Sequence, residues 1–80
     1  MPEVSPELIK VLQVLAEAGD EGIVGEDLAA AAGSKPQLTQ YWLDELLARD
    51  LVAEYMVSGA PTVYLLDTKG RALLAQRGLL

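Results

Sequence analysis

The spacing of the apolar residues changes along this chain, and that change constrains the fold more than any other feature of the sequence. Between residues 8 and 47, apolar side chains recur mostly at intervals of three and four, the period of helices that bury one face. Residues 51–57 and 62–66 are instead rich in β-branched and aromatic residues, and Ser58–Pro61 separates them. The sequence therefore predicts helices first, then two antiparallel strands, then a last helix.

Capping residues, prolines and glycines mark where these elements begin and end. The expected elements are a helix from Ser5–Glu7 to Gly19, a short strand at Ile23–Val24, a helix over residues 26–32, a helix capped by Ser34 and running to about Arg49, strands over 51–57 and 62–66 around a four-residue loop, and a helix over about 68–76 capped by Asp67. Asp50 is expected to adopt a left-handed backbone conformation. In the last helix, Ala72 and Leu73 are expected to face the core, and Leu74 is a further candidate.

The chain is short and lacks two reactive residue types. Its 80 residues fit one domain, over residues 1–80, with a single core. Because it has no cysteine and no histidine, it lacks the usual nucleophile, the usual base at neutral pH and the commonest ligands of transition metals. We therefore expect neither an enzyme nor a cofactor.

No feature of the sequence indicates a membrane protein. The apolar runs are interrupted by polar residues such as Lys10, Gln13 and Glu17, so none is long enough to cross a bilayer. The first four residues, Met-Pro-Glu-Val, do not form a basic leader. We expect a cytoplasmic protein.

Three segments resemble bacterial winged helix-turn-helix regulators. Residues 26–29 and 32–34 are similar to the second helix and the turn of such domains, and Leu43, Leu46, Leu51 and Val52 are similar to the helix that follows and its exit into the hairpin. Residues 64–74 are similar to the closing segment of many such domains, including relatives of the MarR, ArsR and PadR groups. The resemblance covers about residues 5–75 and implies an α+β winged-helix fold. It departs from the family at Asp50, where glycine is usual.

The resemblance also implies a DNA-binding surface. In this fold the helix over residues 34–49 enters the major groove, and the hairpin tip reaches the DNA backbone or minor groove. The implied DNA-binding residues are Ser34, Lys35, Gln37, Gln40 and Tyr41, with Ser58, Gly59 and Ala60 at the tip. In this interpretation Lys35 meets a phosphate, and Gln37 and Gln40 read adenine edges.

The charges of the chain favour a second interpretation. The formal net charge is −6, the hairpin loop has no lysine or arginine, and Asp44 and Glu45 lie on the same helix as Lys35. As a regulator of double-stranded DNA, the chain would therefore need to act as a homodimer. The alternative is an acidic winged-helix module that binds a protein partner and no DNA, in which Gln37 and Gln40 are only solvated residues.

The remaining cations and the surplus apolar residues also have expected roles. Lys69, Arg71 and Arg77 are expected to pair with neighbouring carboxylates. Trp42 is expected to seal the core, and Leu65 to point away from Tyr64 and Leu66. The chain has more apolar side chains than its core needs, among them Trp42, Tyr55, Leu65 and Leu79–Leu80. Some of them should be partly exposed and favour association with another molecule.

Overall fold

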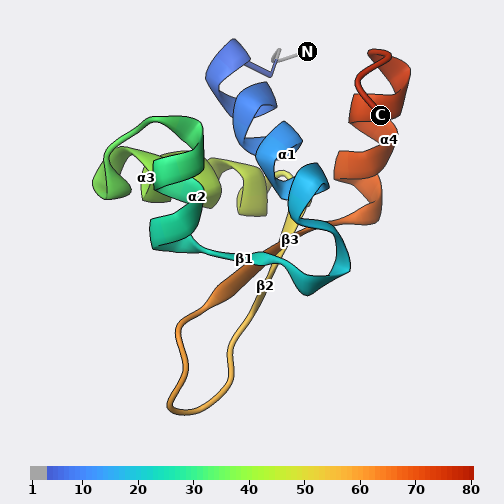
Figure 1. Cartoon of the computed structure of the whole chain (residues 1–80). Helices are drawn as coiled ribbons and strands as arrows, with labels where there is room; N and C mark the ends of the chain where they lie inside the picture. Colours follow the sequence, from blue (N-terminus) through green and yellow to red (C-terminus); the bar gives the residue numbers. More distant parts are fainter. Residues whose placement is uncertain (1–3) are drawn as a thin grey trace.

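The computed structural model describes residues 4–80, which form three packed helices, a small sheet and a fourth helix (Figure 1). The helices are α1 (Pro6–Ala18), α2 (Gly25–Ala32), α3 (Pro36–Ala48) and α4 (Thr68–Gln76), with a 3-10 turn, η1 (Gly19–Glu21), after α1. The strands are β1 (Ile23–Val24), β2 (Val52–Tyr55) and β3 (Val63–Leu66). The expected α+β winged-helix fold and its order of elements are confirmed.

The three strands form one antiparallel sheet in the order β1-β3-β2. Ile23 pairs with Tyr64, and Val52 pairs with Leu66, so β3 is the central strand. Because side chains alternate along a strand, Tyr64 and Leu66 are buried while Leu65 points the other way and is half-buried, as expected. The sheet therefore gives one face of β3 to the helical core.

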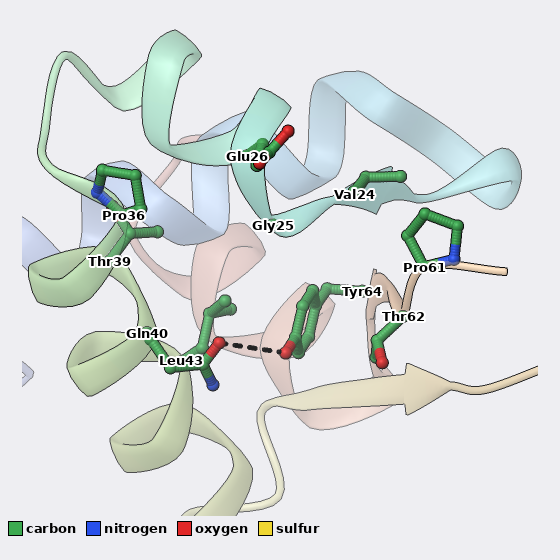
Figure 2. A pocket seen from close by; sticks show the side chains of 10 residues that line it. All are labelled: Val24, Gly25, Glu26, Pro36, Thr39, Gln40, Leu43, Pro61, Thr62 and Tyr64. Atoms are coloured by element: carbon green, nitrogen blue, oxygen red, sulfur yellow. Dashed lines mark hydrogen bonds between the residues drawn. The ribbon is translucent and has the colours of Figure 1, made fainter.

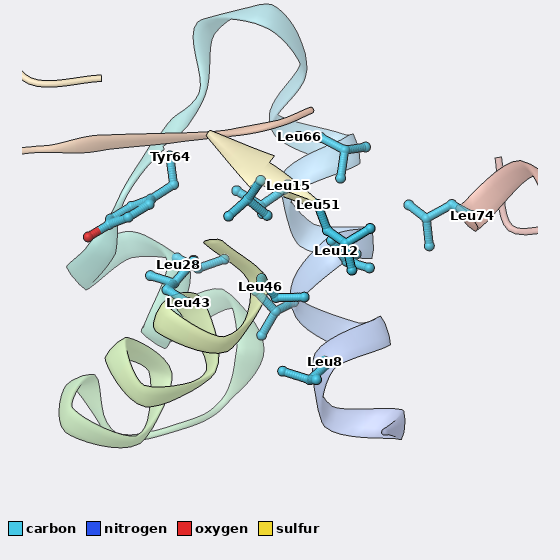
Figure 3. Close-up of a cluster of buried hydrophobic side chains, with 12 residues drawn as sticks. Leu8, Leu12, Leu15, Leu28, Leu43, Leu46, Leu51, Tyr64, Leu66 and Leu74 are labelled. Atoms are coloured by element: carbon cyan, nitrogen blue, oxygen red, sulfur yellow. The ribbon is translucent and has the colours of Figure 1, made fainter. Parts of the chain in front are cut away.

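The core is built mainly from leucines of all four helices (Figure 3). Its fully buried side chains include Leu12 and Leu15 of α1, Leu28 of α2, Leu43 and Leu46 of α3 and Leu74 of α4. Trp42 is half-buried and packs against this cluster, which agrees with its expected sealing role. The core thus holds one side of α3 in place and leaves its other side exposed.

Two helix ends differ in how they are capped. At α1 the hydroxyl of Ser5 accepts a hydrogen bond from the Leu8 amide at 3.4 Å, as the sequence predicted. At α3 the predicted capping by Ser34 is wrong, because Lys35 occupies the N-cap position and no side chain accepts there. Ser34 instead continues the turn from α2, and its amide donates to the carbonyl of Ala29 at 2.9 Å.

The hairpin loop is longer than the sequence indicated. The strands end at Tyr55 and restart at Val63, so the loop covers residues 56–62 rather than the expected four residues. Met56 and Val57 have strand-like composition, but β3 begins too late to pair with them. We call β2, β3 and this loop the wing, and it extends away from the helices (Figure 1).

The last helix begins where the sequence predicted, but the residues that it turns toward the core differ from those expected. The carboxylate of Asp67 accepts from the Thr68 amide at 2.7 Å, and α4 ends at Gln76. Leu74 is fully buried, Leu73 is half-buried, and Ala72 is exposed, so the expected inward position of Ala72 is wrong. Leu74, with buried Gly70 one turn earlier, sets the inward face of α4.

Candidate nucleic-acid interface

A tight turn sets the direction in which α3 leaves α2. Gly33 has a left-handed backbone, with φ of 67°, and its amide donates to the carbonyl of Ala30 at 3.1 Å. After Ser34 and Lys35, Pro36 occupies the first position of α3, where its missing amide hydrogen costs nothing. This geometry is the helix-turn-helix that the resemblance implied.

One side of α3 is open to solvent and carries most of the residues that the sequence suggested. Gln37, Gln40 and Tyr41 are all exposed on it, and Lys35 is exposed at its start. Tyr41 has 61% of its surface accessible. Ser34 is only half-buried in the turn beside them. The structure therefore brings the five predicted residues together in the first half of α3 and the turn before it.

Gln40 differs from its neighbours because both ends of its amide are engaged. Its Oε1 accepts from the hydroxyl of Tyr64 at 3.3 Å, and its Nε2 donates to Oδ1 of Asp44 at 3.0 Å. Tyr64 belongs to β3 and is only 5% exposed, so the first bond links the wing to α3 (Figure 2). Sequence reasoning missed both partners of this amide.

A hollow of about 410 Å³ lies where α2, α3 and the base of the wing meet (Figure 2). Its lining residues are Val24, Gly25, Glu26, Pro36, Thr39, Gln40, Leu43, Pro61, Thr62 and Tyr64. The bond between Tyr64 and Gln40 lies in this lining. Thr39 is 1% exposed, and its hydroxyl has no hydrogen-bond partner within residues 4–80. The lining contains a carboxylate and no cation.

The wing tip is exposed and uncharged. Ser58, Gly59 and Ala60 are all exposed, and the Ala60 amide closes a turn by donating to the carbonyl of Val57 at 3.0 Å. Gly59 has φ of 80°, a conformation that glycine adopts without strain. The loop over residues 56–62 therefore offers backbone and hydroxyl groups to a partner but no positive charge.

Among residues 4–80, three of the six cations form ion pairs with carboxylates. Arg49 pairs with Glu45 at 3.5 Å, Lys69 with Asp50 at 3.9 Å and Arg71 with Asp20 at 3.5 Å. The pairing expected for Lys69 and Arg71 is confirmed, whereas Arg77 has no ion pair within the described residues. Lys35 likewise has no ion pair in this part of the chain, so it is the cation of α3 that remains available to a phosphate.

The described residues offer neither a membrane span nor a cluster of metal ligands. No helix of residues 4–80 is both long and apolar enough to cross a membrane. The same residues contain no group of three or more side chains suited to hold a metal ion.

Comparison with known proteins gives matches among solved structures. No family model and no curated protein sequence matches the chain. MepR, a Staphylococcus aureus transcription regulator of the efflux pump MepA, superposes with a TM-score of 0.86 at 20% identity, over 92% of this chain and 55% of MepR. An S. aureus MepR–DNA complex superposes with a TM-score of 0.87 at 19% identity, over 94% of this chain and 62% of that chain.

A third match is ZitR of Lactococcus lactis, a zinc-responsive MarR family member. Its TM-score is 0.81 at 14% identity, over 96% of this chain and 53% of ZitR. The chain thus spans about half the length of the regulators that it matches. At these identities the likeness concerns the fold, and it confirms the resemblance expected from the sequence: this chain has the winged-helix fold found in MarR-type transcription regulators.

Proposed function

We propose that this chain is a cytoplasmic winged-helix transcription regulator, a single domain over residues 1–80 without enzyme activity, that binds double-stranded DNA. In this proposal α3 lies in the major groove and the wing lies beside it along the DNA. The observation that carries the proposal is the open side of α3, on which Gln37, Gln40 and Tyr41 are exposed next to Lys35. The MepR–DNA complex, which shares the fold over 94% of this chain, supports it.

Each residue has a chemical role in this proposal. Lys35 contacts a phosphate at the start of α3, where the partial positive charge of the helix end adds to its own charge. Gln37 and Gln40 contact base edges, and Tyr41 donates its hydroxyl to a phosphate. Ser34 and Ser58 contact the DNA backbone through their hydroxyl groups and Gly59 through its amide. Ala60, whose amide donates to Val57, contacts the DNA backbone through its methyl group.

The charges predict that one copy binds weakly. Affinity for DNA depends on the number of phosphates neutralised, and α3 supplies Lys35 alone, because Arg49 is paired with Glu45. Two copies related by a twofold axis would double this number and place two α3 helices in successive major grooves. We therefore propose that the DNA-binding form is a homodimer.

The proposal is tested by duplex binding at low salt. Fluorescence anisotropy with a labelled random duplex would compare the wild type with Lys35→Glu. Arg77→Glu is the matched control, because Arg77 is exposed, unpaired among the described residues and at the end of α4, far from the wing tip (Figure 1). The proposal predicts that Lys35→Glu weakens duplex binding and that Arg77→Glu has little effect. Equal binding by all three proteins would refute it.

A second candidate function is a module that binds a protein partner. Leu38 and Tyr41 are 46% and 61% exposed on α3. A hollow of about 240 Å³ beside Tyr41 and Trp42 is also lined by the ion pair of Glu45 and Arg49. An exposed apolar surface beside a paired acid and base is typical of a protein interface, and it offers no unpaired cation to a phosphate. Under this alternative, the wild type binds no duplex at low salt, and Tyr41→Ala impairs binding of the partner.

A further inference from the structure

The amide of Gln40 forms one hydrogen bond through its oxygen and one through its nitrogen. The Tyr64 hydroxyl donates to Oε1 at 3.3 Å, and Nε2 donates to Asp44 Oδ1 at 3.0 Å. Asp44 lies one turn further along α3, whereas Tyr64 lies on β3, 24 residues away in the sequence. The amide is therefore tied both to its own helix and to the wing, and Figure 2 shows the bond to the wing.

The chemistry of these partners fixes which end of the amide points where. An ionised carboxylate only accepts hydrogen bonds, so the nitrogen of Gln40 must face Asp44. The oxygen then faces Tyr64, whose hydroxyl must donate. Because the Tyr64 ring is packed in the core with 5% exposure, its hydroxyl is a fixed point. Turning the amide over would place its oxygen against the Asp44 carboxylate and lose that bond, although Tyr64 could then accept from the amide nitrogen.

These two bonds leave Gln40 with unused hydrogen-bonding capacity. A side-chain amide has two N–H donors and two acceptor positions on its oxygen, and each bond uses one of them. One donor and one acceptor remain, and Gln40 is exposed. A donor next to an acceptor is the pattern that matches N7 and the 6-amino group of adenine in the major groove.

We propose that Tyr64 and Asp44 are positioning residues that fix the Gln40 amide as a reader of adenine. The inference rests on the proposed function, since it applies only if α3 enters the major groove. Gln37 is the internal comparison, because it is exposed on the same helix and its side chain has no hydrogen-bond partner within residues 4–80. Gln40 is thus held in one orientation before DNA arrives, and its specificity depends on two residues that need not touch the DNA.

The experiment selects binding sites from a random duplex library with the wild type, Tyr64→Phe and Asp44→Asn. A well-oriented bidentate contact discriminates roughly 5- to 150-fold against the other base pairs. We expect such a preference for adenine at the position that Gln40 contacts in each half-site of the wild type, and its reduction to about twofold or less in Tyr64→Phe. Affinity of Tyr64→Phe for a random duplex should stay within about twofold of the wild type.

The Asp44→Asn variant separates the effect of the Gln40 amide orientation from the effect of the Asp44 charge. An asparagine can donate as well as accept, so the Gln40 amide can turn over, and the adenine preference should fall as in Tyr64→Phe. Affinity for a random duplex should rise, because a carboxylate beside the groove is removed. Each variant has a matched control. Tyr55→Phe deletes an exposed hydroxyl on β2, and Asp50→Asn removes a charge beyond α3. Both controls should keep the wild-type preference for adenine.

The outcomes distinguish this inference from the proposed function. If the wild type prefers adenine and both variants keep the same preference, the positioning role is refuted while DNA binding stands. If the wild type binds no duplex even at low salt, the proposed function is refuted, and base reading with it. The side-chain amide NMR signals of Gln40 in the free protein provide a further check, since Tyr64→Phe should shift them and Tyr55→Phe should not.

Discussion

Gly70 of α4 lies directly against the carbonyl oxygen of Leu51, so close that a Cβ on Gly70 would overlap it. The same carbonyl accepts a hydrogen bond from the Asp67 amide at 3.1 Å. The start of α4 is therefore fixed to the residue that precedes β2, and this contact joins the last helix to the wing. Only glycine allows so close an approach between a helix and a backbone carbonyl.

Gly70→Ala should therefore destabilise the fold. The added methyl group would force α4 away from Leu51, and overpacking of this kind costs about 1–3 kcal/mol. Gly25→Ala is the control, because a Cβ there would make an ordinary contact at 3.6 Å with the Tyr64 ring. Urea unfolding followed by Trp42 fluorescence measures both. A Gly70→Ala protein as stable as Gly25→Ala would contradict the packing described here.

Thr39→Val should stabilise the protein. The Thr39 hydroxyl is buried and has no hydrogen-bond partner among residues 4–80, and a buried unsatisfied polar group costs about 1–3 kcal/mol. Valine keeps the shape and removes the hydroxyl, so we expect a gain of about 1 kcal/mol in the free energy of unfolding. Thr39→Ser, which keeps the hydroxyl and removes the methyl group, should instead be less stable than the wild type. A destabilised Thr39→Val protein would show that the hydroxyl is satisfied.

Asp50 has a left-handed backbone, with φ of 61°, and it pairs with Lys69 at 3.9 Å while both side chains are well exposed. An exposed pair of this kind contributes little, so Asp50→Asn should leave the free energy of unfolding unchanged. Asp50→Val should lower it by about 1–3 kcal/mol, because a β-branched residue is strained at positive φ. Thermal unfolding of the two variants checks this. Equal destabilisation of both variants would mean that the ion pair with Lys69, and not the backbone conformation, determines how much Asp50 contributes to stability.

The fold was predictable because its signals are local. Apolar spacing, the Ser5 and Asp67 caps and the glycines around Ile23–Val24 each act within a few residues, and the structure agrees with them. The left-handed conformation expected at Asp50 is also confirmed. The error at Ser34 arose because α3 begins one residue later than expected, with Lys35 as N-cap and Pro36 at its first position. The error at Ala72 arose because the buried face of α4 runs through Gly70 and Leu74 instead.

The candidate site was predictable only in part. Composition and position identified the exposed residues of α3, but Asp44 counted only as an unfavourable charge. A Gln and an Asp four residues apart on a helix are a known hydrogen-bonding pair, so that contact could have been found from sequence. The contact of Gln40 with Tyr64 joins residues 24 apart, and no local pattern indicates it.

The salt dependence of duplex binding tests the central claim, that α3 presents Lys35 to DNA. The slope of log K against log salt concentration becomes shallower by about 0.9 for each phosphate that the protein no longer neutralises. We predict that the slope of Lys35→Gln is shallower than that of the wild type by about this amount per subunit, while the slope of Arg77→Gln is unchanged. Identical slopes for the wild type and Lys35→Gln would contradict the claim.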